Sequence, residues 1–310
     1  MNDAAIETIG LTRYFGRKAA LRQLTLTVPR GSVFALLGRN GSGKTTAIRI
    51  LMGMLDATRG SAKVLGQAPD HLTSATRARI GYLAEGHHVY GWMRIEQCAQ
   101  FQSSAYAHWN WDIFHSVIKH FGLDADARAR NLSRGERAGL CLALTLAPEP
   151  ELLILDDPAL GLDPVARRSL LEAMVFVTRG EDRTILFSSH VLSDIERVAD
   201  RVAILDRGTL RACCTVDTFR QRLGQWVLRY DRPPTEQPDL SEITGLVHAA
   251  AVDNEWRVIV ANPNDQTEAL LSRLGATSLE TAPLNLEDAV IHYLGERGRR
   301  GLLLSNGGAT

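Results

Sequence analysis

Residues 38–45, which read GRNGSGKT, are the segment that most restricts what this chain can fold into. They fit the pattern G-x-x-x-x-G-K-[ST] at every required position, and they lie between the apolar run Val33–Leu37 and a stretch with helical patterning at 45–54. In this context glycines let successive backbone N–H groups turn toward phosphate oxygens, and the start of the helix adds positive potential. The segment therefore predicts a phosphate-binding loop between a buried strand and a helix.

A second segment supplies the carboxylate that such a loop needs to hold a metal ion. The apolar run Leu152–Leu155 predicts a buried strand, and Asp156 and Asp157 follow it directly. Alone, the two aspartates are no more than a polar strand end. Together with the loop they predict a site for a nucleoside triphosphate and Mg²⁺, in which Lys44 reaches the β- and γ-phosphates and Thr45 and Asp156 hold the metal.

Composition and charge exclude several other classes of protein. The chain has 310 residues, 45% of them hydrophobic, which is ordinary globular usage and suggests about two domains. Lys+Arg and Asp+Glu are balanced at 35 each, without the positive excess of a dedicated nucleic-acid binder, so no nucleic-acid partner is expected. The sequence has no apolar run near the roughly 20 residues of a membrane span, no CxxC pair and no secretory signal. We therefore expect an intracellular chain with reduced cysteines.

The order of predicted strands and helices is that of an α/β protein. Alternating apolar residues at Leu24, Leu26 and Val28 predict a strand ahead of the loop. After the strand at 152–155, Asp163-Pro164 is a helix start, and strands at 184–187 and 202–205 flank a further helix, which predicts a largely parallel sheet. Residues 86–147 read as a mainly helical insertion, whose aromatic residues are expected to lie mostly in a core between helices.

The pattern changes after Gly224, where we expect the first domain, residues 1–224, to end. Residues 225–296 predict a small α+β domain. Its parts are a hairpin of strands at 245–252 and 255–260, a helix at 265–274, a short strand near Ser278 and a helix at 286–294. Residues 297–310, which include several arginines and glycines, are expected to form a flexible tail.

Further short segments narrow the interpretation to one family. They are LSRGER at 132–137, ALGLD at 159–163 and SSH at 188–190. In this order and spacing, with the loop and the 152–157 segment, the chain resembles the ATP-binding subunit of ABC transporters over about residues 4–224. The resemblance implies the P-loop NTPase fold of an ABC cassette, with a mixed, mainly parallel sheet core, an N-terminal antiparallel subdomain and the helical insertion.

The resemblance also implies roles for single residues. Those that would carry catalysis are Asp157, His190 and Lys44. Those that would hold Mg²⁺ are Thr45, Glu85 and Asp156. Those that would contact ATP are Phe15, Gly38, Asn40, Gly41, Ser42, Gly43, Lys44, Thr45, Thr46, Ser133, Gly135 and Asp163. Phe15 stands where an aromatic ring stacks on adenine in this family, and Tyr14 is a close alternative.

The 132–137 segment has two interpretations that can hold together. In the family, Ser133 and Gly135 would contact the γ-phosphate held by the opposite subunit, and Asp163 would communicate across that dimer. The spacing Ser133-x-x-Glu136 is also a capping box, which starts a helix. The family usually reads L-S-G-G-Q here, so Arg134 adds bulk and positive charge, and Glu136 adds a negative charge near a phosphate.

Asp157 is a second departure, because the family normally has a glutamate there to polarise the attacking water. Aspartate is one methylene shorter, which removes roughly 1.5 Å of reach. A misplacement of about 1 Å can lower a rate on the order of 10²-fold. We therefore expect slow rather than absent ATP hydrolysis.

The resemblance finally implies partners. The chain would act as a homodimer or heterodimer of ATPase subunits with a separate transmembrane permease, on the cytoplasmic face of the membrane. The 82–85 stretch, the tryptophan-rich insertion and the 285–289 segment resemble exporters of the ABC-2 type. The alternative is a nucleotide-gated regulatory or non-transport ABC protein with very slow turnover. The pairs His87-His88 and His115 with His120 lack metal-ligand spacing and are expected to be solvated or packing residues.

Overall fold

The computed structural model describes residues 4–178, 183–232, 238–282 and 304–305. The chain divides into two compact units, Met1–Leu210 and Arg211–Thr310. None of the helices in these described ranges combines the length and the apolar character that crossing a bilayer requires.

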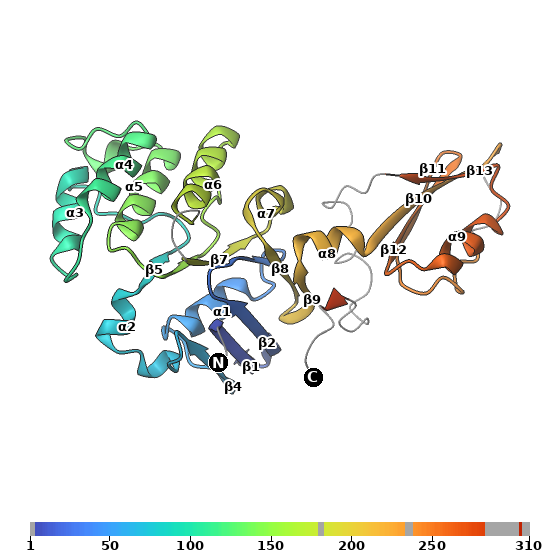
Figure 1. Cartoon of the computed structure of the whole chain (residues 1–310), viewed down its shortest axis with the longest axis horizontal. Coiled ribbons are helices and arrows are strands. Elements are labelled where there is room, and N and C mark those ends of the chain that lie inside the picture. Colours follow the sequence, from blue (N-terminus) through green and yellow to red (C-terminus); the bar gives the residue numbers. More distant parts are fainter. Residues whose placement is uncertain (1–3, 179–182, 233–237, 283–303, 306–310) are drawn as a thin grey trace. The chain divides into compact units, whose positions relative to one another are not determined.

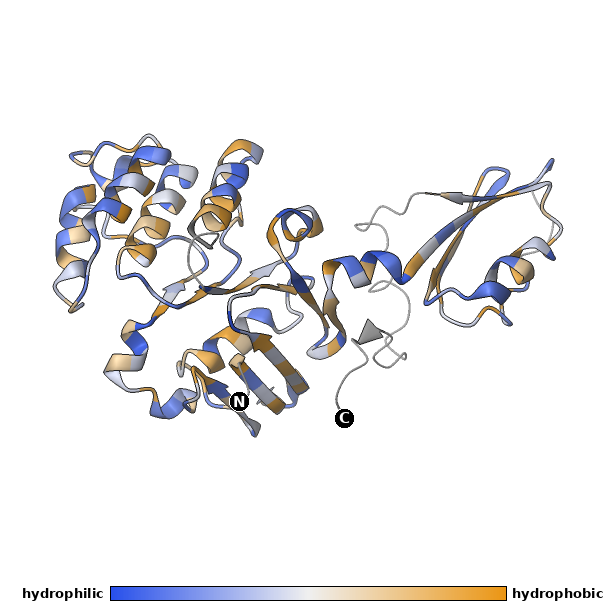
Figure 2. Ribbon diagram, viewed as in Figure 1, coloured by the Kyte–Doolittle hydropathy of each residue, from blue (hydrophilic) through white to orange (hydrophobic). Residues whose placement is uncertain are grey.

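The first unit begins with an antiparallel sheet (Figure 1). Its strands are β1 (Ala4–Phe15), β2 (Lys18–Pro29) and β4 (Arg59–Val64), in the order β2-β1-β4. Hydrophobic and hydrophilic residues alternate along these strands (Figure 2), because one face of the sheet is buried and the other is not. The expected N-terminal antiparallel subdomain is thereby confirmed.

A parallel sheet forms the centre of the first unit. It contains β3 (Val33–Leu37), β5 (Ile80–Leu83), β6 (Leu152–Leu155), β7 (Thr184–Ser189) and β8 (Arg201–Asp206), in the order β8-β3-β7-β6-β5. Every residue of β6 and β7 is buried, as the continuous apolar runs predict. The accompanying helices are α1 (Lys44–Leu51), α2 (Ser74–Ala78), α6 (Pro164–Thr178) and α7 (Leu192–Val198), with a 3₁₀ turn at Pro69–His71.

The segment between β5 and β6 contains only helices as regular structure (Figure 1). These are α3 (Ile95–Ser103), α4 (Trp111–His120), a 3₁₀ turn at Ala129–Asn131 and α5 (Arg134–Leu146). The expectation that most of its aromatic residues pack in a core is met by four of the seven from Trp92 to Phe121. Phe114 is fully buried and Tyr106, Trp109 and Phe121 are half-buried. Trp92 and Phe101 are 68% and 57% exposed, and Trp111 is also exposed.

The second unit contains an antiparallel sheet in the order β11-β12-β10-β13. Its elements are α8 (Val216–Gln221), β10 (Leu223–Arg229), β11 (Leu246–Val252), β12 (Glu255–Ala261), α9 (Asp265–Ser272) and β13 (Ser278–Ala282). The residues that form its core are Trp226, Leu228, Ile243, Trp256, Val258, Val260 and Leu271. The predicted hairpin is confirmed, since Val252 pairs with Glu255.

In the C-terminal part, the structure differs from some of the expectations and does not describe others. Gly224, the expected domain end, lies inside β10, which pairs with β12 and β13, and the division between the compact units falls earlier, after Leu210. The predicted helix at 286–294 lies outside the described residues. In the tail expected to be flexible, Leu304–Ser305 form β14, which pairs in parallel with β9 (Thr209–Thr215), and the rest is not described.

Candidate nucleotide-binding site

The functional residues predicted from the sequence follow neighbouring strands of the parallel sheet. Leu37 of β3 is paired with Ser189 of β7, and Leu155 of β6 is paired with Phe187 of β7. The glycine-rich loop, His190 and Asp156 therefore leave the sheet at the same edge. The carboxyl edge of such a sheet is where α/β proteins bind ligands.

Two glycines of the loop are required by close backbone approaches. A Cβ atom on Gly38 would lie 2.5 Å from the carbonyl oxygen of Leu205, and one on Gly43 would lie 2.6 Å from that of Ala20. Gly43 also has φ of 110°, in the left-handed region that favours glycine. It precedes α1, whose start has no side-chain cap, so the first N–H groups of the helix are available to an anion.

Lys44 is folded back onto this loop. Its ammonium donates hydrogen bonds to the carbonyl oxygens of Gly38, at 2.6 Å, and Arg39, at 3.4 Å, and the residue is only 6% exposed. Burial lowers the pKa of Lys44, whereas the negative charges of Asp157 and Asp156 act in the opposite direction. The loop thus holds a cation that a phosphate oxygen can attract away from neutral carbonyl groups.

Asp156 joins the strand end to the loop. Its Oδ1 accepts hydrogen bonds from Thr45 Oγ1, at 3.1 Å, and from Ser188 Oγ, at 2.9 Å, and the residue is 1% exposed. Burial raises the pKa of Asp156, and the bonds from Ser188 and Thr45 oppose that shift. The predicted contact between the loop and the 152–157 segment is therefore present in the structure.

These oxygens suit a magnesium ion. A hydroxyl and a carboxylate held 3.1 Å apart are hard oxygen donors of the type that Mg²⁺ takes. Within the described ranges no group of three or more His, Cys, Asp or Glu side chains is placed to hold a metal. Mg²⁺ is usually bound through one or two carboxylates together with substrate phosphates and water, and Asp156 supplies one such carboxylate.

Asp157 and His190 form a pair at this edge. His190 Nδ1 lies 3.0 Å from Asp157 Oδ2, and Asp157 is 7% exposed. An ionised carboxylate only accepts hydrogen bonds, so Nδ1 carries the proton and Nε2 is left for another partner. Asp157 has φ of 47°, which is uncommon for a residue with a side chain.

A cavity of about 510 Å³ lies over the loop. The residues that line it are Phe15, Lys18, Ala20, Asn40, Gly41, Gly43, Lys44, Thr45, Thr46, Glu85 and Asp157. Of the two aromatic candidates only Phe15 is among these lining residues, and it is half exposed, which favours it over Tyr14. The guanidinium carbon of Arg13 lies 4.9 Å from the centre of the Phe15 ring, so one side of that ring is already covered.

Ser133, Gly135 and Asp163 are not among the residues that line this cavity. Ser133 Oγ accepts the N–H of Glu136 at 3.2 Å, and Glu136 Oε2 accepts the N–H of Ser133 at 2.7 Å, so the predicted capping box is confirmed. A Cβ on Gly135 would lie 2.6 Å from Cβ of Ala166 on α6.

Asp163 begins α6, as its position before Pro164 predicts. Its Oδ1 accepts the N–H groups of Val165, at 2.9 Å, and Ala166, at 3.1 Å. These bonds favour the ionised carboxylate and lower the pKa of Asp163.

Sequence reasoning missed three residues near the predicted ones. Lys18 and Ala20 line the cavity from β2, and Ser188 bonds to Asp156 from β7. The signal that could have identified Ser188 is a polar residue directly after the apolar residues Ile185–Phe187 of the predicted strand. His87, expected to be a packing or solvated histidine, is 5% exposed, and its Nε2 lies 2.8 Å from the carbonyl oxygen of Pro158.

Comparisons with known proteins agree with this geometry. The ABC transporter family model matches residues 21–160. The ABC transporter ATP-binding protein YtrB of Bacillus subtilis is 26% identical over 95% of this chain and 99% of its own length. The daunorubicin resistance ATP-binding protein DrrA3 of Streptomyces coeruleorubidus is 31% identical over 94% of this chain and 93% of its own length.

A solved structure of the ATP-binding subunit of an ABC transporter has a similar fold. It superimposes with a TM-score of 0.62 and 28% identity, covering 70% of this chain and 92% of its own. The expected cassette fold is thereby confirmed. The sheet edge, the glycine-rich loop and these relatives together show that the chain belongs to the ABC transporter family, as one of its ATP-binding and ATP-hydrolysing subunits.

Proposed function

We propose that this chain binds ATP with Mg²⁺ in the cavity over the loop and hydrolyses it to drive export through a separate transmembrane permease. The observation that carries the proposal is the 3.1 Å contact between Thr45 and Asp156, which brings together the two side chains best suited to hold the metal. Similarity to YtrB and DrrA3 along nearly the whole chain favours a transport subunit over a non-transport ABC protein.

In this proposal the loop and Lys44 bind the phosphates. The Lys44 ammonium, now 2.6 Å from the carbonyl oxygen of Gly38, would turn toward oxygens of the β- and γ-phosphates. The Thr45 hydroxyl and the Asp156 carboxylate would hold Mg²⁺, and Glu85 offers a further oxygen from the same cavity. When bound, Mg²⁺ neutralises charge on the β- and γ-phosphates.

Asp157 would orient the attacking water and take its proton. His190 supports this role, because its Nδ1–H, 3.0 Å from Oδ2, holds the Asp157 carboxylate. Donation from Nε2 to the γ-phosphate would need the imidazolium form, in which both ring nitrogens carry a proton. We still expect slow hydrolysis, because the aspartate side chain reaches roughly 1.5 Å less far than the glutamate that is usual in the family.

Ser133, Gly135 and Asp163 would act on the nucleotide of a second ATPase subunit. The start of α5 is exposed at Ser133 and Arg134, and the capping box takes up the N–H groups of Ser133 and Glu136. The Arg134 charge and the N–H groups of Arg134 and Gly135 would then meet a phosphate that another subunit presents.

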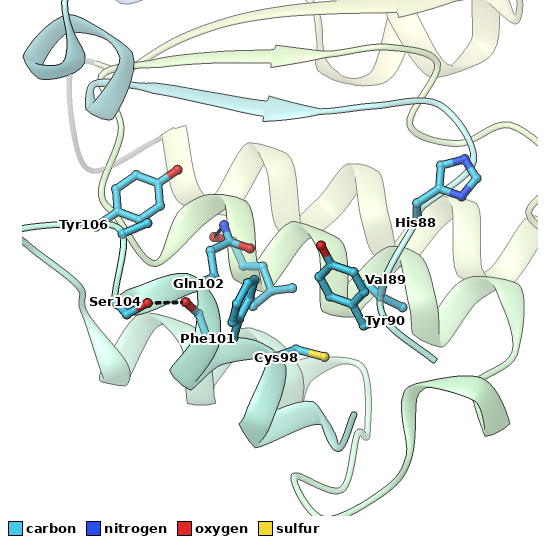
Figure 3. A pocket seen from close by; sticks show the side chains of 10 residues that line it. His88, Val89, Tyr90, Cys98, Phe101, Gln102, Ser104 and Tyr106 are labelled. Carbon is cyan, nitrogen blue, oxygen red and sulfur yellow. Dashed lines mark hydrogen bonds between the residues drawn. The ribbon is translucent and has the colours of Figure 1, made fainter. Parts of the chain in front are cut away.

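The permease would contact a groove on the helical segment. A pocket of about 630 Å³ there is lined partly by His88, Val89 and Tyr90, from the loop after β5, and by Phe101 of α3 (Figure 3). Tyr90 is 56% exposed, and its ring centre lies 5.7 Å from that of Phe101. The same loop carries Glu85 into the nucleotide cavity, which gives a cytoplasmic segment of the permease a short connection to the bound phosphates.

Phosphate release from ATP by the purified chain tests the hydrolytic part of the proposal. We expect slow release that requires Mg²⁺ and is lost in Lys44→Ala. Thr184→Val, a buried substitution in the same sheet, should leave the rate unchanged. The proposal would be contradicted if the unaltered chain released phosphate as fast in EDTA as in Mg²⁺, or if Lys44→Ala released it as fast as the unaltered chain.

A further inference from the structure

Ser188 is a buried serine beside the strand end that carries the acidic residues. It is 0% exposed and lies on β7, and because Leu155 pairs with Phe187, the next residues along the two parallel strands are Asp156 and Ser188. Ser188 Oγ donates to Asp156 Oδ1 at 2.9 Å and accepts the N–H of Asp157 at 2.8 Å. One hydroxyl group therefore contacts both acidic residues.

The first of these bonds sets the direction of the Asp156 carboxylate. The hydroxyl groups of Ser188 and Thr45 both donate to the same oxygen, Oδ1, at 2.9 and 3.1 Å. Two donors, one on the strand β7 and one on the helix α1, hold Oδ1 and so restrict rotation of the carboxylate. Outer hydrogen bonds of this kind hold metal-ligating carboxylates in position, and their loss typically lowers metal affinity about 10–100-fold.

The second bond fixes the backbone of Asp157. This residue has φ of 47°, a conformation that residues with a side chain adopt rarely. Its N–H is held by Ser188, and its carboxylate lies 3.0 Å from His190 Nδ1. The hydroxyl of Ser188 thus restrains the turn from which the Asp157 side chain reaches His190.

We propose that Ser188 is a positioning residue for the Mg²⁺-dependent reaction, because its single hydroxyl orients the Asp156 carboxylate toward the metal and holds the Asp157 backbone. The inference rests on the proposed function, in which Asp156 holds Mg²⁺. A serine that only stabilised the pairing of β6 and β7 would affect the stability of the fold and leave the affinity for Mg²⁺ unchanged. The two roles therefore differ in a measurable quantity.

The experiment compares Ser188→Ala with Thr184→Val in the full chain. Thr184 is a matched control, because it lies on the same strand, is 2% exposed, and accepts one backbone N–H, that of Gly31, at 3.0 Å at the opposite end of β7. Binding of a fluorescent ATP analogue is measured first in EDTA, and Mg²⁺ is then titrated into the nucleotide complex. Thermal unfolding shows that each variant is folded.

We expect Ser188→Ala to bind the analogue in EDTA as tightly as the unaltered chain, but to need about 10–100-fold more Mg²⁺ for half-saturation. Thr184→Val should shift neither quantity. Ser188→Thr keeps the hydroxyl and should restore the Mg²⁺ requirement. Ser188→Cys, with similar volume and a weaker donor, should lie between the two and replaces Ser188→Ala if that variant does not fold.

An unchanged Mg²⁺ requirement in folded Ser188→Ala or Ser188→Cys would overturn the inference, and so would an equal shift in Thr184→Val. If Asp156→Asn abolishes the Mg²⁺ response while these variants keep it, the proposed function stands and only the role of Ser188 fails. If the unaltered chain shows no Mg²⁺ response at all, both fail.

Discussion

The acidic end of β6 and the start of α5 both carry residues expected to contact a triphosphate, but they are organised in opposite ways. Asp156 is 1% exposed and takes hydrogen bonds from β7 and α1, elements far away in sequence. Ser133 is exposed and bonds to Glu136, three residues along the same helix. The first group is assembled by the fold, and the second is satisfied locally.

This difference indicates what each group needs in order to act. Buried polar groups are costly unless paired, so the fixed network around Asp156 is ready for a ligand within one chain. The start of α5 has no internal ligand to meet, and its capping box stabilises the helix whether or not a phosphate is present. In the proposed function, its contribution to hydrolysis therefore depends on a second subunit.

The largest effect is expected from Asp156→Asn. This substitution removes the charge that faces the metal and keeps the shape of the side chain, so turnover should fall about 10²–10³-fold. Phosphate release at saturating ATP and Mg²⁺ measures it. A fall of less than about tenfold would show that the strand end is not the metal site.

A smaller effect on turnover, with none on binding, is expected from Ser133→Ala. Loss of the side-chain cap should lower stability by about 1 kcal/mol. Turnover should fall about tenfold if the serine meets the nucleotide of a partner, since one hydrogen bond to a charged group contributes on this scale. Nucleotide affinity of the isolated chain stays unchanged. Unchanged turnover would leave Ser133 as a helix cap alone.

Two substitutions of Asp157 test whether the length and the charge of its side chain set the rate of hydrolysis. Asp157→Glu restores roughly 1.5 Å of reach and should raise turnover, by up to about 10²-fold if reach alone limits the rate. Asp157→Asn removes the base and should lower it. Single-turnover rates of ATP cleavage distinguish the two, and equal rates in both variants would show that Asp157 is not the carboxylate that activates water.

The smallest effect concerns the helix cap at Asp163. Backbone N–H groups lower the pKa of this carboxyl below its ordinary value of 3.8, so the ionised form stabilises the fold above that value and the gain is lost as pH falls through the lowered pKa. Asp163→Ala should unfold at a lower temperature than the unaltered chain at pH 7. The difference between the two unfolding temperatures should become smaller below a pH of about 3.8. A difference independent of pH would exclude this role.

The sequence alone was sufficient to predict the features that depend only on a local pattern of residues. The glycines at 38 and 43, the apolar run Leu152–Leu155 and the hairpin around 253–254 each carry their own signal, and the structure has them as expected. Local chemistry decides such features, because a strand end or a turn needs few residues from elsewhere.

Features that depend on packing between distant segments were not predictable in the same way. Ser188 meets Asp156 only through the register of β6 and β7, which no single segment specifies. The exposure of Trp92 and Phe101 depends on how short helices pack, and a hydrophobic pattern alone does not say which aromatic rings remain outside.

The central claim is that the strand end of one chain suffices to hold the metal–nucleotide complex, whereas the start of α5 serves another subunit. Mn²⁺, which takes the same oxygen ligands as Mg²⁺, allows a direct measurement by electron paramagnetic resonance on the isolated chain with ATP. The account predicts ATP-dependent Mn²⁺ binding that Asp156→Asn abolishes and Ser133→Ala leaves unchanged. Binding that survives Asp156→Asn, or that disappears in Ser133→Ala, would contradict it.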